Sequence, residues 1–290
     1  MCFFATRSSM KIRMKRKLAV VLLICISCHI GWAAQDFVWK SGQNMKVVCD
    51  TTEAPVVKVA LDLLKRDCRS VLSGEISRSE NTGNIYVGTW GESSVLQALA
   101  ETHQLDVAQL NEHKEAFLLN VLPDGRLVVA GSDKRGTAYG VLELSRMMGV
   151  SPWEWWADAV PEKKEEFRLP AGFRKLDYPQ VAYRGIFIND EDWGLTPWSW
   201  KHYEPSERKG QIGPKTHARI FELLLRLQAN TFWPAMHECS IPFFFTEGNK
   251  EMADKYAIYL GTSHCEPMMR NTNGEWKTAG KGEYDYIHNR

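Results

Sequence analysis

The chain has 290 residues, and its 36 lysines and arginines nearly balance 35 aspartates and glutamates, which gives a formal net charge of +1. This balance excludes a strongly basic nucleic-acid-binding protein and a protein with an acidic tail. With 44% hydrophobic and 24% charged residues, the composition is that of a globular chain and is too apolar for a disordered one.

The first 34 residues have the pattern of a secretory signal peptide. Residues 1–17 contain six basic residues and no acidic one, an apolar run follows over 18–26, and small residues end the segment at Ala33 and Ala34. We expect cleavage after one of these alanines and export to the periplasm or the extracellular space. The apolar run is short for a transmembrane helix, so we expect no membrane association after cleavage. A retained membrane anchor and a lipoprotein are the alternatives.

The mature chain is mildly acidic, because thirty basic residues then remain against 35 acidic ones. Four cysteines remain as well, which is too few for a disulfide-stabilised scaffold. One bridge is compatible with an oxidising compartment, but the sequence does not assign its partners. The remaining cysteines are Cys49, Cys68, Cys239 and Cys265.

Residues 35–150 alternate between strand and helix patterns. Hydrophobic residues recur at helical spacing over 55–72, and the Pro-Asp-Gly sequence at 123–125 is typical of a hairpin turn. The expected elements are strands over 45–49, 85–88, 117–121 and 127–130, and helices over 55–72, 94–100 and 137–148. This order indicates a small α/β domain with a mixed sheet.

Residues 151–180 have a different composition, rich in tryptophan, proline and charged residues. We interpret this segment as a connector that follows the first domain, with a domain boundary near 175–180. Trp153, Trp155 and Trp156 are expected to pack in the core or between domains rather than to bind a ligand.

A regular strand–helix alternation begins again at residue 181. The expected elements are strands over 181–188, 230–233 and 258–262, and helices that begin at Pro214 and at Asn249. The apolar end of the first strand is typical of a buried parallel strand. The β-α-β-α-β order predicts a parallel doubly wound sheet or the start of a (β/α)8 barrel over residues 181–290.

Each of these three strands is followed by a cluster of polar residues, over 189–193, 233–238 and 263–267. The carboxyl ends of parallel strands open on one face of such folds, and that face holds the active site. We therefore expect the three clusters to meet in space.

The first cluster contains three carboxylates. Paired carboxylates serve as general acid and base or bind sugar hydroxyls, so Asp190 and Asp192 are the candidate catalytic residues. Asn189 and Glu191 are candidate substrate-binding residues. A solvated acidic loop or a cation site is the alternative.

Two histidines each lie near a glutamate, His237 beside Glu238 and His264 near Glu266. No HExxH or CxxC spacing is present, so we favour hydrogen bonding to a sugar or a carboxylate over metal binding, with a structural histidine as the remaining alternative. We expect no metal and no cofactor.

Tryptophans flank the polar clusters, and flat aromatic faces pack on the apolar faces of sugar rings. Trp193 and Trp233 are the candidate sugar-stacking residues, with Trp198 and Trp200 beside them. No stripe of basic and aromatic residues supports nucleic-acid binding, the 131–136 loop lacks the GK[ST] of a phosphate loop, and there is no GxSxG motif.

In ordered segments from residue 131 to the end, the chain resembles glycoside hydrolase family 115, the xylan α-glucuronidases. The segments that carry the resemblance are 131–137, 151–158, 184–194, 212–216, 229–230, 233–237 and 263–268. Residues 35–130 add only a compatible order of elements.

The resemblance implies an N-terminal α/β domain, a (β/α)8 catalytic barrel and further C-terminal domains. It implies hydrolysis, with inversion, of the α-1,2 link between (4-O-methyl-)glucuronic acid and xylose. The implied partners are glucuronoxylan or aldouronic acid oligosaccharides, and a homodimer of the full-length parent is left open. The implied contacts to substrate are those of Asn189, Glu191, Trp193, Trp233, His237, His264 and Glu266, around Asp190 and Asp192.

A barrel needs about 250 residues, and about 110 follow Val181, enough for three βα units. We therefore expect an N-terminal fragment that lacks the general acid and is inactive alone. The alternatives are a non-catalytic carbohydrate-binding or interaction protein, an exo-glycosidase of hexosaminidase-like layout, and a fragment without independent function.

Overall fold

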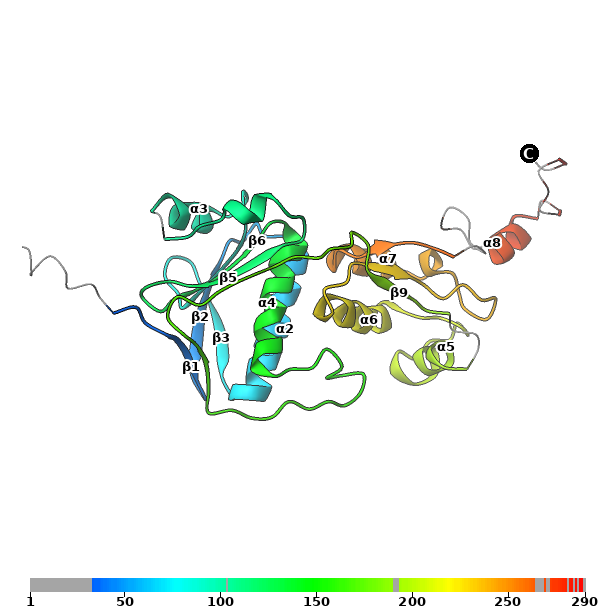
Figure 1. Cartoon of the computed structure of the whole chain (residues 1–290). Helices are drawn as coiled ribbons and strands as arrows, with labels where there is room; N and C mark the ends of the chain where they lie inside the picture. Colours follow the sequence, from blue (N-terminus) through cyan, green and yellow to red (C-terminus); the bar gives the residue numbers. More distant parts are fainter. Residues whose placement is uncertain are drawn as a thin grey trace, which may run out of the picture.

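The computed structural model describes residues 33–102, 104–189, 193–263, 269, 272–280, 282–283, 285 and 287–288. The chain forms an α/β structure with two main sheets, one of six strands and one of three. Figure 1 shows the six-stranded unit and the three-stranded unit side by side, with helices α2 and α4 of the first facing α6 and α7 of the second.

The six-stranded sheet has the order β3-β2-β4-β6-β5-β8. Its first four strands in this order are parallel, whereas β5 runs antiparallel to both β6 and β8. The predicted mixed sheet and its hairpin are thus confirmed. The strands are β2 Asn44–Cys49, β3 Glu75–Ser79, β4 Ile85–Thr89, β5 Phe117–Val121, β6 Leu127–Gly131 and β8 Arg174–Asp177.

Hydrophobic side chains are buried on both faces of this sheet, because successive residues of a strand point to opposite sides. Phe117 and Leu119 face the core formed with α2 (Pro55–Leu72) and α4 (Lys134–Met148). Leu118 and Val128 face a second core beneath α3 (Ser94–Glu101) and η1 (Ala108–Asn111). The unit therefore has three layers.

Helix α4 begins at Lys134, three residues before the predicted start at Thr137. The carboxylate of Asp133 caps it by accepting hydrogen bonds from the backbone N–H groups of Arg135 and Gly136 at 2.9 and 3.0 Å. A capping aspartate satisfies backbone donors that have no partner within the helix. The 131–136 loop is thus a helix cap.

Two strands lie inside the segment interpreted as a connector. β7 (Glu166–Leu169) pairs antiparallel with β1 (Phe37–Lys40), and β8 is the edge strand of the six-stranded sheet. The sequence interpretation missed both strands. They join the second half of residues 151–180 to the six-stranded unit.

The three-stranded sheet consists of β9 (Gly185–Phe187), β10 (Thr231–Trp233) and β11 (Tyr259–Leu260), all parallel. Helices α6 (Pro214–Arg226) and α7 (Asn249–Lys255) connect them, so the predicted β-α-β-α-β order is confirmed. The strand over 181–188 was wrongly expected to be buried. Ile186 and Phe187 are exposed because β9 pairs only with β10 among the described residues.

The helices of the two units share one hydrophobic core, to which α6 contributes Phe221 and Leu224. Beside it, the guanidinium of Arg226 donates hydrogen bonds to both carboxylate oxygens of Asp67 on α2, at 2.8 and 3.0 Å. Both side chains are buried, and a buried charge persists only with a well-placed partner. The pair therefore ties α6 to α2.

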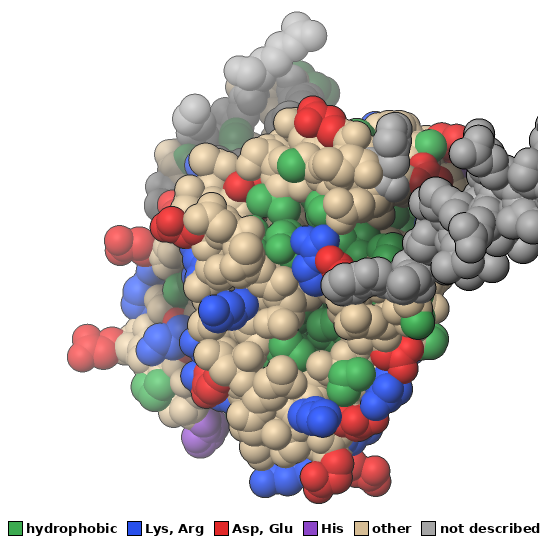
Figure 2. All heavy atoms as spheres, turned by 90° about the vertical axis from the view of Figure 1, so that its left-hand side faces the viewer, with side chains coloured by type: hydrophobic (Ala, Val, Ile, Leu, Met, Phe, Trp, Pro, Cys, Tyr) green, Lys and Arg blue, Asp and Glu red, His purple; other side chains and the backbone are tan. Residues whose placement is uncertain are grey.

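The shorter elements include α5 (Leu195–Trp198), the π-helical turn η2 (Ser199–Tyr203), the 3-10 turn η3 (Phe243–Phe245) and α8 (Thr272–Ala279). In the part of the chain that the structure describes, no helix combines the length and hydropathy needed to cross a membrane. Figure 2 views the six-stranded unit from the side turned away from the three-stranded sheet, and acidic and basic side chains are interspersed there without a large patch of one sign.

Candidate active site

The carboxyl ends of β9, β10 and β11 lie along one edge of their sheet. The ladder fixes this alignment, because the backbone N–H of Ile188 donates to the carbonyl of Trp233 at 2.9 Å and that of Gly261 to the carbonyl of Phe232 at 3.0 Å. Polar segments therefore leave all three strands on the same side. We call this region the strand-end edge; its described residues are Asn189, Trp233, Met236, His237, Glu238 and Ser263.

Trp233 is the aromatic residue of the strand-end edge. Its indole is partly exposed and contacts the ring of Phe187 edge to face, with centroids 5.9 Å apart. A Cβ on Gly261 would lie 2.2 Å from the indole nitrogen. The indole of Trp233 therefore fits in this place only because residue 261 is glycine, and the close approach sets the orientation of the indole.

The segment after β10 is joined to the segment after β11 and to α8. The hydroxyl of Ser263 hydrogen-bonds the sulfur of Met236. The ammonium of Lys277 on α8 donates to the carboxylate of Glu238 at 2.9 Å, and this hydrogen bond lowers the pKa of Glu238. The sequence interpretation missed Lys277, which has no neighbouring motif to mark it.

The structure brings together three of the predicted site residues, Asn189, Trp233 and His237, on the strand-end edge. Among the tryptophans that the structure describes, Trp193 is the most exposed, with 89% of its surface accessible. The other candidates, Asp190, Glu191, Asp192, His264 and Glu266, lie outside the described residues. Their roles stay predictions.

Trp198 was grouped with the sugar-facing tryptophans, but it packs in an aromatic cluster. Its ring stacks on Tyr203 with centroids 4.8 Å apart and lies 6.1 Å from the rings of both Trp155 and Trp156. The indole N–H of Trp156 donates to the carbonyl of Arg219 on α6 at 3.1 Å. The packing role predicted for Trp155 and Trp156 is thus confirmed, and Trp198 shares it. Trp153 was expected to pack with them but is exposed, so the prediction is wrong for that residue.

Within the described ranges, no three His, Cys, Asp or Glu side chains are grouped closely enough to hold a metal ion. Cys49 and Cys68 are buried free thiols. Burial raises the pKa of both Cys49 and Cys68 to about 12, so neither is a reactive thiolate at neutral pH.

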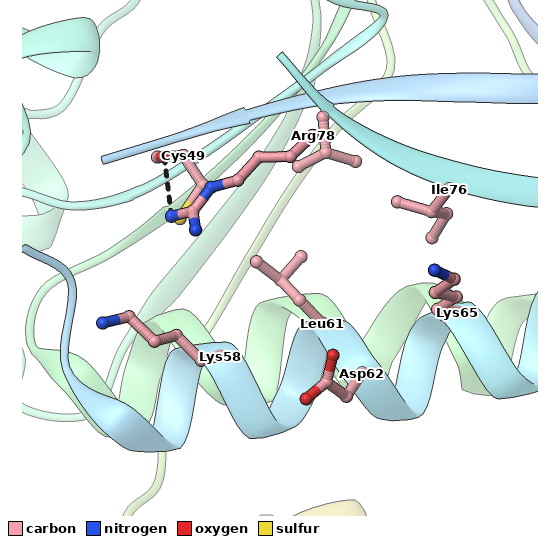
Figure 3. Close-up of a pocket in the computed structure, with 8 residues that line it drawn as sticks. Cys49, Lys58, Leu61, Asp62, Lys65, Ile76 and Arg78 are labelled. Carbon is pink, nitrogen blue, oxygen red and sulfur yellow. Dashed lines mark hydrogen bonds between the residues drawn. The ribbon is translucent and has the colours of Figure 1, made fainter. Parts of the chain in front are cut away.

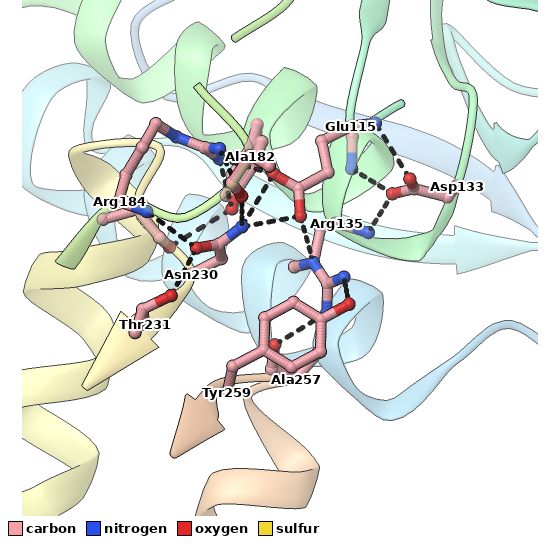
Figure 4. Close-up of polar contacts among 12 residues, drawn as sticks. Glu115, Asp133, Arg135, Ala182, Arg184, Asn230, Thr231, Ala257 and Tyr259 are labelled. Atoms are coloured by element: carbon pink, nitrogen blue, oxygen red, sulfur yellow. Dashed lines mark hydrogen bonds and ion pairs between the residues drawn. The ribbon is translucent and has the colours of Figure 1, made fainter. Parts of the chain in front are cut away.

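The opposite ends of the same strands carry a buried polar network, which no sequence pattern predicts. Glu115, in the loop before β5, accepts hydrogen bonds from Arg135 at 2.6 Å, from Asn230 at 2.8 Å, and from Arg184. Burial alone would raise the pKa of Glu115, but these hydrogen bonds lower it. Figure 4 shows Arg184 and Asn230, just before β9 and β10, converging on this carboxylate.

Tyr259, the first residue of β11, completes the network. The guanidinium of Arg135 lies over its ring, 4.2 Å from the centroid, and hydrogen-bonds its hydroxyl. All three strands are therefore anchored to the six-stranded unit at their amino ends.

Comparison with known proteins gives a family match over the second unit. Residues 176–290 match the model of glycosyl hydrolase family 115. A solved structure, a family GH115 4-O-methyl-α-glucuronidase named BtGH115A with specificity for decorated arabinogalactans, is 62% identical with a TM-score of 0.83. The match covers 87% of this chain and 33% of that protein, so the chain spans about a third of the relative's length.

Both findings agree on one protein family. The chain belongs to glycosyl hydrolase family 115, and the matched residues include all three strands and the whole strand-end edge.

More distant solved structures are also similar. A Flavobacterium johnsoniae chitobiase is 12% identical with a TM-score of 0.45, over 84% of this chain and 36% of that one. A Vibrio harveyi exo-β-N-acetylglucosaminidase is 12% identical with a TM-score of 0.44, over 83% and 36%. Comparison with curated proteins gives no match.

Proposed function

We propose that the chain carries the N-terminal α/β unit and part of the active site of an α-glucuronidase, which hydrolyses (4-O-methyl-)glucuronic acid side chains from an acidic polysaccharide with inversion. The observation that supports this proposal is the alignment of the carboxyl ends of three parallel strands, each followed in sequence by a polar segment, inside the segment that matches the family. On this proposal, β9, β10 and β11 are the first three strands of a (β/α)8 barrel.

Asp190 and Asp192 supply one of the two carboxyl functions that an inverting glycosidase needs. In such enzymes the acid and the base lie about 6.5–9.5 Å apart, which leaves room for a water molecule between the base and the sugar. One of the two aspartates serves as the base that activates this water, or as the group that orients it. The general acid comes from another strand end of the proposed barrel.

The other strand-end residues bind the substrate. The partly exposed indole of Trp233 offers a flat face for the C–H side of a sugar ring, and Trp193 offers a second. His237 and His264 donate hydrogen bonds to the uronate carboxylate. Asn189, Glu191 and Glu266 bind sugar hydroxyls, which need both donors and acceptors.

Two polysaccharides suit this site, and the relative favours one of them. The family resemblance points to glucuronoxylan, whereas the relative that is 62% identical has specificity for decorated arabinogalactans. We propose a decorated arabinogalactan as the preferred substrate. Glucuronoxylan and its aldouronic acid oligosaccharides are the second candidate.

The remaining features of the proposal concern the whole protein. Residues 1–34 direct export to the periplasm or the extracellular space, where polysaccharides of this size are accessible. The protein has a non-catalytic domain over 35–150, a connector over 151–180 whose strands β7 and β8 pair with that domain, and a catalytic domain from 181 onward. The full-length parent is proposed to form a homodimer.

The test is a chimera in which this chain replaces the matching third of BtGH115A, with the unmodified relative as positive control. We expect the chimera to release 4-O-methylglucuronic acid from decorated arabinogalactan, measured by chromatography of the products. A chimera that folds, as judged by a cooperative thermal transition, and releases no uronic acid from either polysaccharide would contradict the proposal. Binding of oligosaccharide without release would favour a non-catalytic carbohydrate-binding protein.

A further inference from the structure

A groove lies in the six-stranded unit, between helix α2 and the edge strand β3. It has a volume of about 180 Å³ and is lined by Val47, Cys49, Lys58, Leu61, Asp62, Lys65, Ile76 and Arg78. Its lining residues lie on α2, β2 and β3, and none lies on the three-stranded sheet. The groove is thus separate from the strand-end edge.

The groove has an excess of positive charge. Lys58, Lys65 and Arg78 line it against one acidic residue, Asp62. Among the residues that the structure describes, no ion pair within 4.0 Å joins Asp62 to Lys58 or to Lys65. The two ammonium groups therefore keep their charge available for an anionic ligand.

One of the cations is held in place by the backbone. The guanidinium of Arg78 donates from a single nitrogen, Nη2, to the carbonyl oxygens of Cys49 and Asp50, each at 3.2 Å. These carbonyls lie at the carboxyl end of β2, and Arg78 lies near the carboxyl end of β3. Ligands of open α/β sheets bind outside this end of the strands.

Apolar side chains lie between the charged ends of the groove. Figure 3 shows Leu61 from α2 and Ile76 from β3 facing into it, with Lys58 and Arg78 toward one end and Lys65 toward the other. Both apolar residues are partly buried. A ligand with an anionic group and an apolar face fits this arrangement, and a sugar ring presents such a face.

The size of the groove limits what it holds. Pockets for drug-sized ligands have volumes of about 300–1,000 Å³, so a groove of about 180 Å³ suits a single sugar residue or a small anion. An inorganic anion would contact the basic side chains of the groove but gain nothing from Leu61 and Ile76. A uronic acid residue would contact the basic side chains through its carboxylate and the apolar side chains through its ring.

We propose that this groove binds a uronic acid residue of an acidic oligosaccharide, as a second carbohydrate site remote from the strand-end edge. The carboxylate binds at Lys58 and Arg78, the apolar face of the ring packs on Leu61 and Ile76, and Lys65 contacts a hydroxyl of the ring. The proposal rests on the proposed function, since a polymer that carries many uronic acid side chains can occupy both sites at once. Two linked sites raise the overall affinity for such a polymer.

The test is titration calorimetry of the 290-residue chain with aldotetraouronic acid, and with neutral xylotriose and inorganic phosphate in separate arms. We compare the Lys58→Glu/Lys65→Glu variant with a matched control, Lys163→Glu/Lys250→Glu, which makes the same charge change at exposed positions outside the groove. A third variant, Trp233→Ala, weakens binding at the strand-end edge and leaves the groove intact. Circular dichroism checks that all variants fold.

We expect the charge change in the groove to weaken binding of the acidic oligosaccharide at least about tenfold, because it replaces two charge-assisted contacts by repulsion. The control variant Lys163→Glu/Lys250→Glu and the Trp233→Ala variant are expected to bind the acidic oligosaccharide at the groove as tightly as the wild-type chain does. Xylotriose is expected to bind the groove much more weakly.

Three outcomes would overturn the proposal: absence of binding to the wild-type chain, equal binding by the groove variant, and binding of phosphate as tight as that of the oligosaccharide. The proposed function fails separately, by absence of uronic acid release from the chimera. Release without groove-dependent binding contradicts only the second site, and groove-dependent binding without release contradicts only the enzyme activity.

Discussion

Glu115 and Arg184 are 69 residues apart in sequence, yet their side chains form an ion pair that joins the six-stranded unit to the start of strand β9. Arg184 also donates to the carbonyl oxygen of Gln228 at 2.7 Å, so the same guanidinium reaches the turn before β10. Because these contacts lie at the amino ends of the strands, they set where the carboxyl ends, and hence the strand-end edge, are placed.

The first prediction concerns this ion pair. Glu115→Gln keeps the size of the side chain but leaves the largely buried guanidinium groups of Arg135 and Arg184 without a countercharge. We expect the free energy of unfolding to fall by about 3 kcal/mol, as for other buried pairs that lose one partner. Urea unfolding followed by circular dichroism measures it.

Glu75→Gln is the matched control, since Glu75 pairs with Arg69 through two hydrogen bonds but both side chains are exposed. Solvent screens such a pair, and we expect little change in stability. Equal effects of the two substitutions would contradict the role given to Glu115.

The second prediction concerns the pH dependence of stability. His217 on α6 is fully buried, its Nδ1 contacts the carbonyl of Gly213 at 3.0 Å and Oδ1 of Asn249 at 3.1 Å, and burial lowers its pKa to about 4. Between this value and 6.5, the unfolded chain binds a proton at His217 and the folded chain does not. Stability should therefore fall as the pH drops from 6.5 to about 4, by about 3 kcal/mol from this group.

Urea unfolding at a series of pH values measures this slope, and His217→Gln is the comparison. The substitution costs stability at neutral pH, because the imidazole packs near Phe243 and Phe232, but it removes the proton-binding site. We expect a flatter dependence between pH 6.5 and 5. A slope that stays the same in His217→Gln would show that another group is responsible.

The third prediction concerns the acidic segment after β9. In the chimera with BtGH115A, Asp190→Asn and Asp192→Asn each remove a carboxylate and keep the shape of the side chain. If one of these aspartates acts as the base, the chimera that carries its substitution should release uronic acid at least about 100-fold more slowly, within the range for general acid–base catalysis. Turnover at the wild-type rate in both variants would remove this segment from the mechanism.

The fourth prediction concerns Trp233. Replacing its indole with a methyl group removes the proposed stacking face, so Trp233→Ala in the chimera should raise KM about tenfold. Because the ring also packs on Phe187, we expect a lower melting temperature as well. Trp193→Ala, at the exposed tryptophan, should change KM without changing the melting temperature. An unchanged KM in both variants would exclude sugar stacking at these residues.

The sequence predicted elements that have a clear hydrophobic pattern, either a short apolar run or one apolar face. The helices over 55–72 and 214–226 were found because apolar residues recur along one face, and the parallel order of the last three strands followed from their spacing. The edge strands β3 and β8 were missed, since their solvent-facing positions carry polar residues and their sequences, Glu75–Ser79 and Arg174–Asp177, lack a clear alternation.

For the candidate site, the sequence predicted that the three polar segments after β9, β10 and β11 lie close together, but it did not predict which other residues contact them. Glycine at the end of a strand is a signal of close approach, and Gly261 beside Trp233 could have been recognised by it. Lys277 and Glu115 could not, because each meets its partner through the tertiary fold and no local pattern marks either residue. Trp198 was misassigned for the same reason, since its neighbours Trp155 and Trp156 are about forty residues away in sequence.

The central claim is that the strand-end edge of this chain takes part in removing glucuronic acid from a polysaccharide. The most direct measurement is the release of 4-O-methylglucuronic acid from decorated arabinogalactan by the chimera, together with the anomeric configuration of the product by proton NMR. The account predicts release with the β-anomer formed first, since inversion converts the α-linkage. A folded chimera that releases no uronic acid, or that releases the α-anomer first, would contradict it.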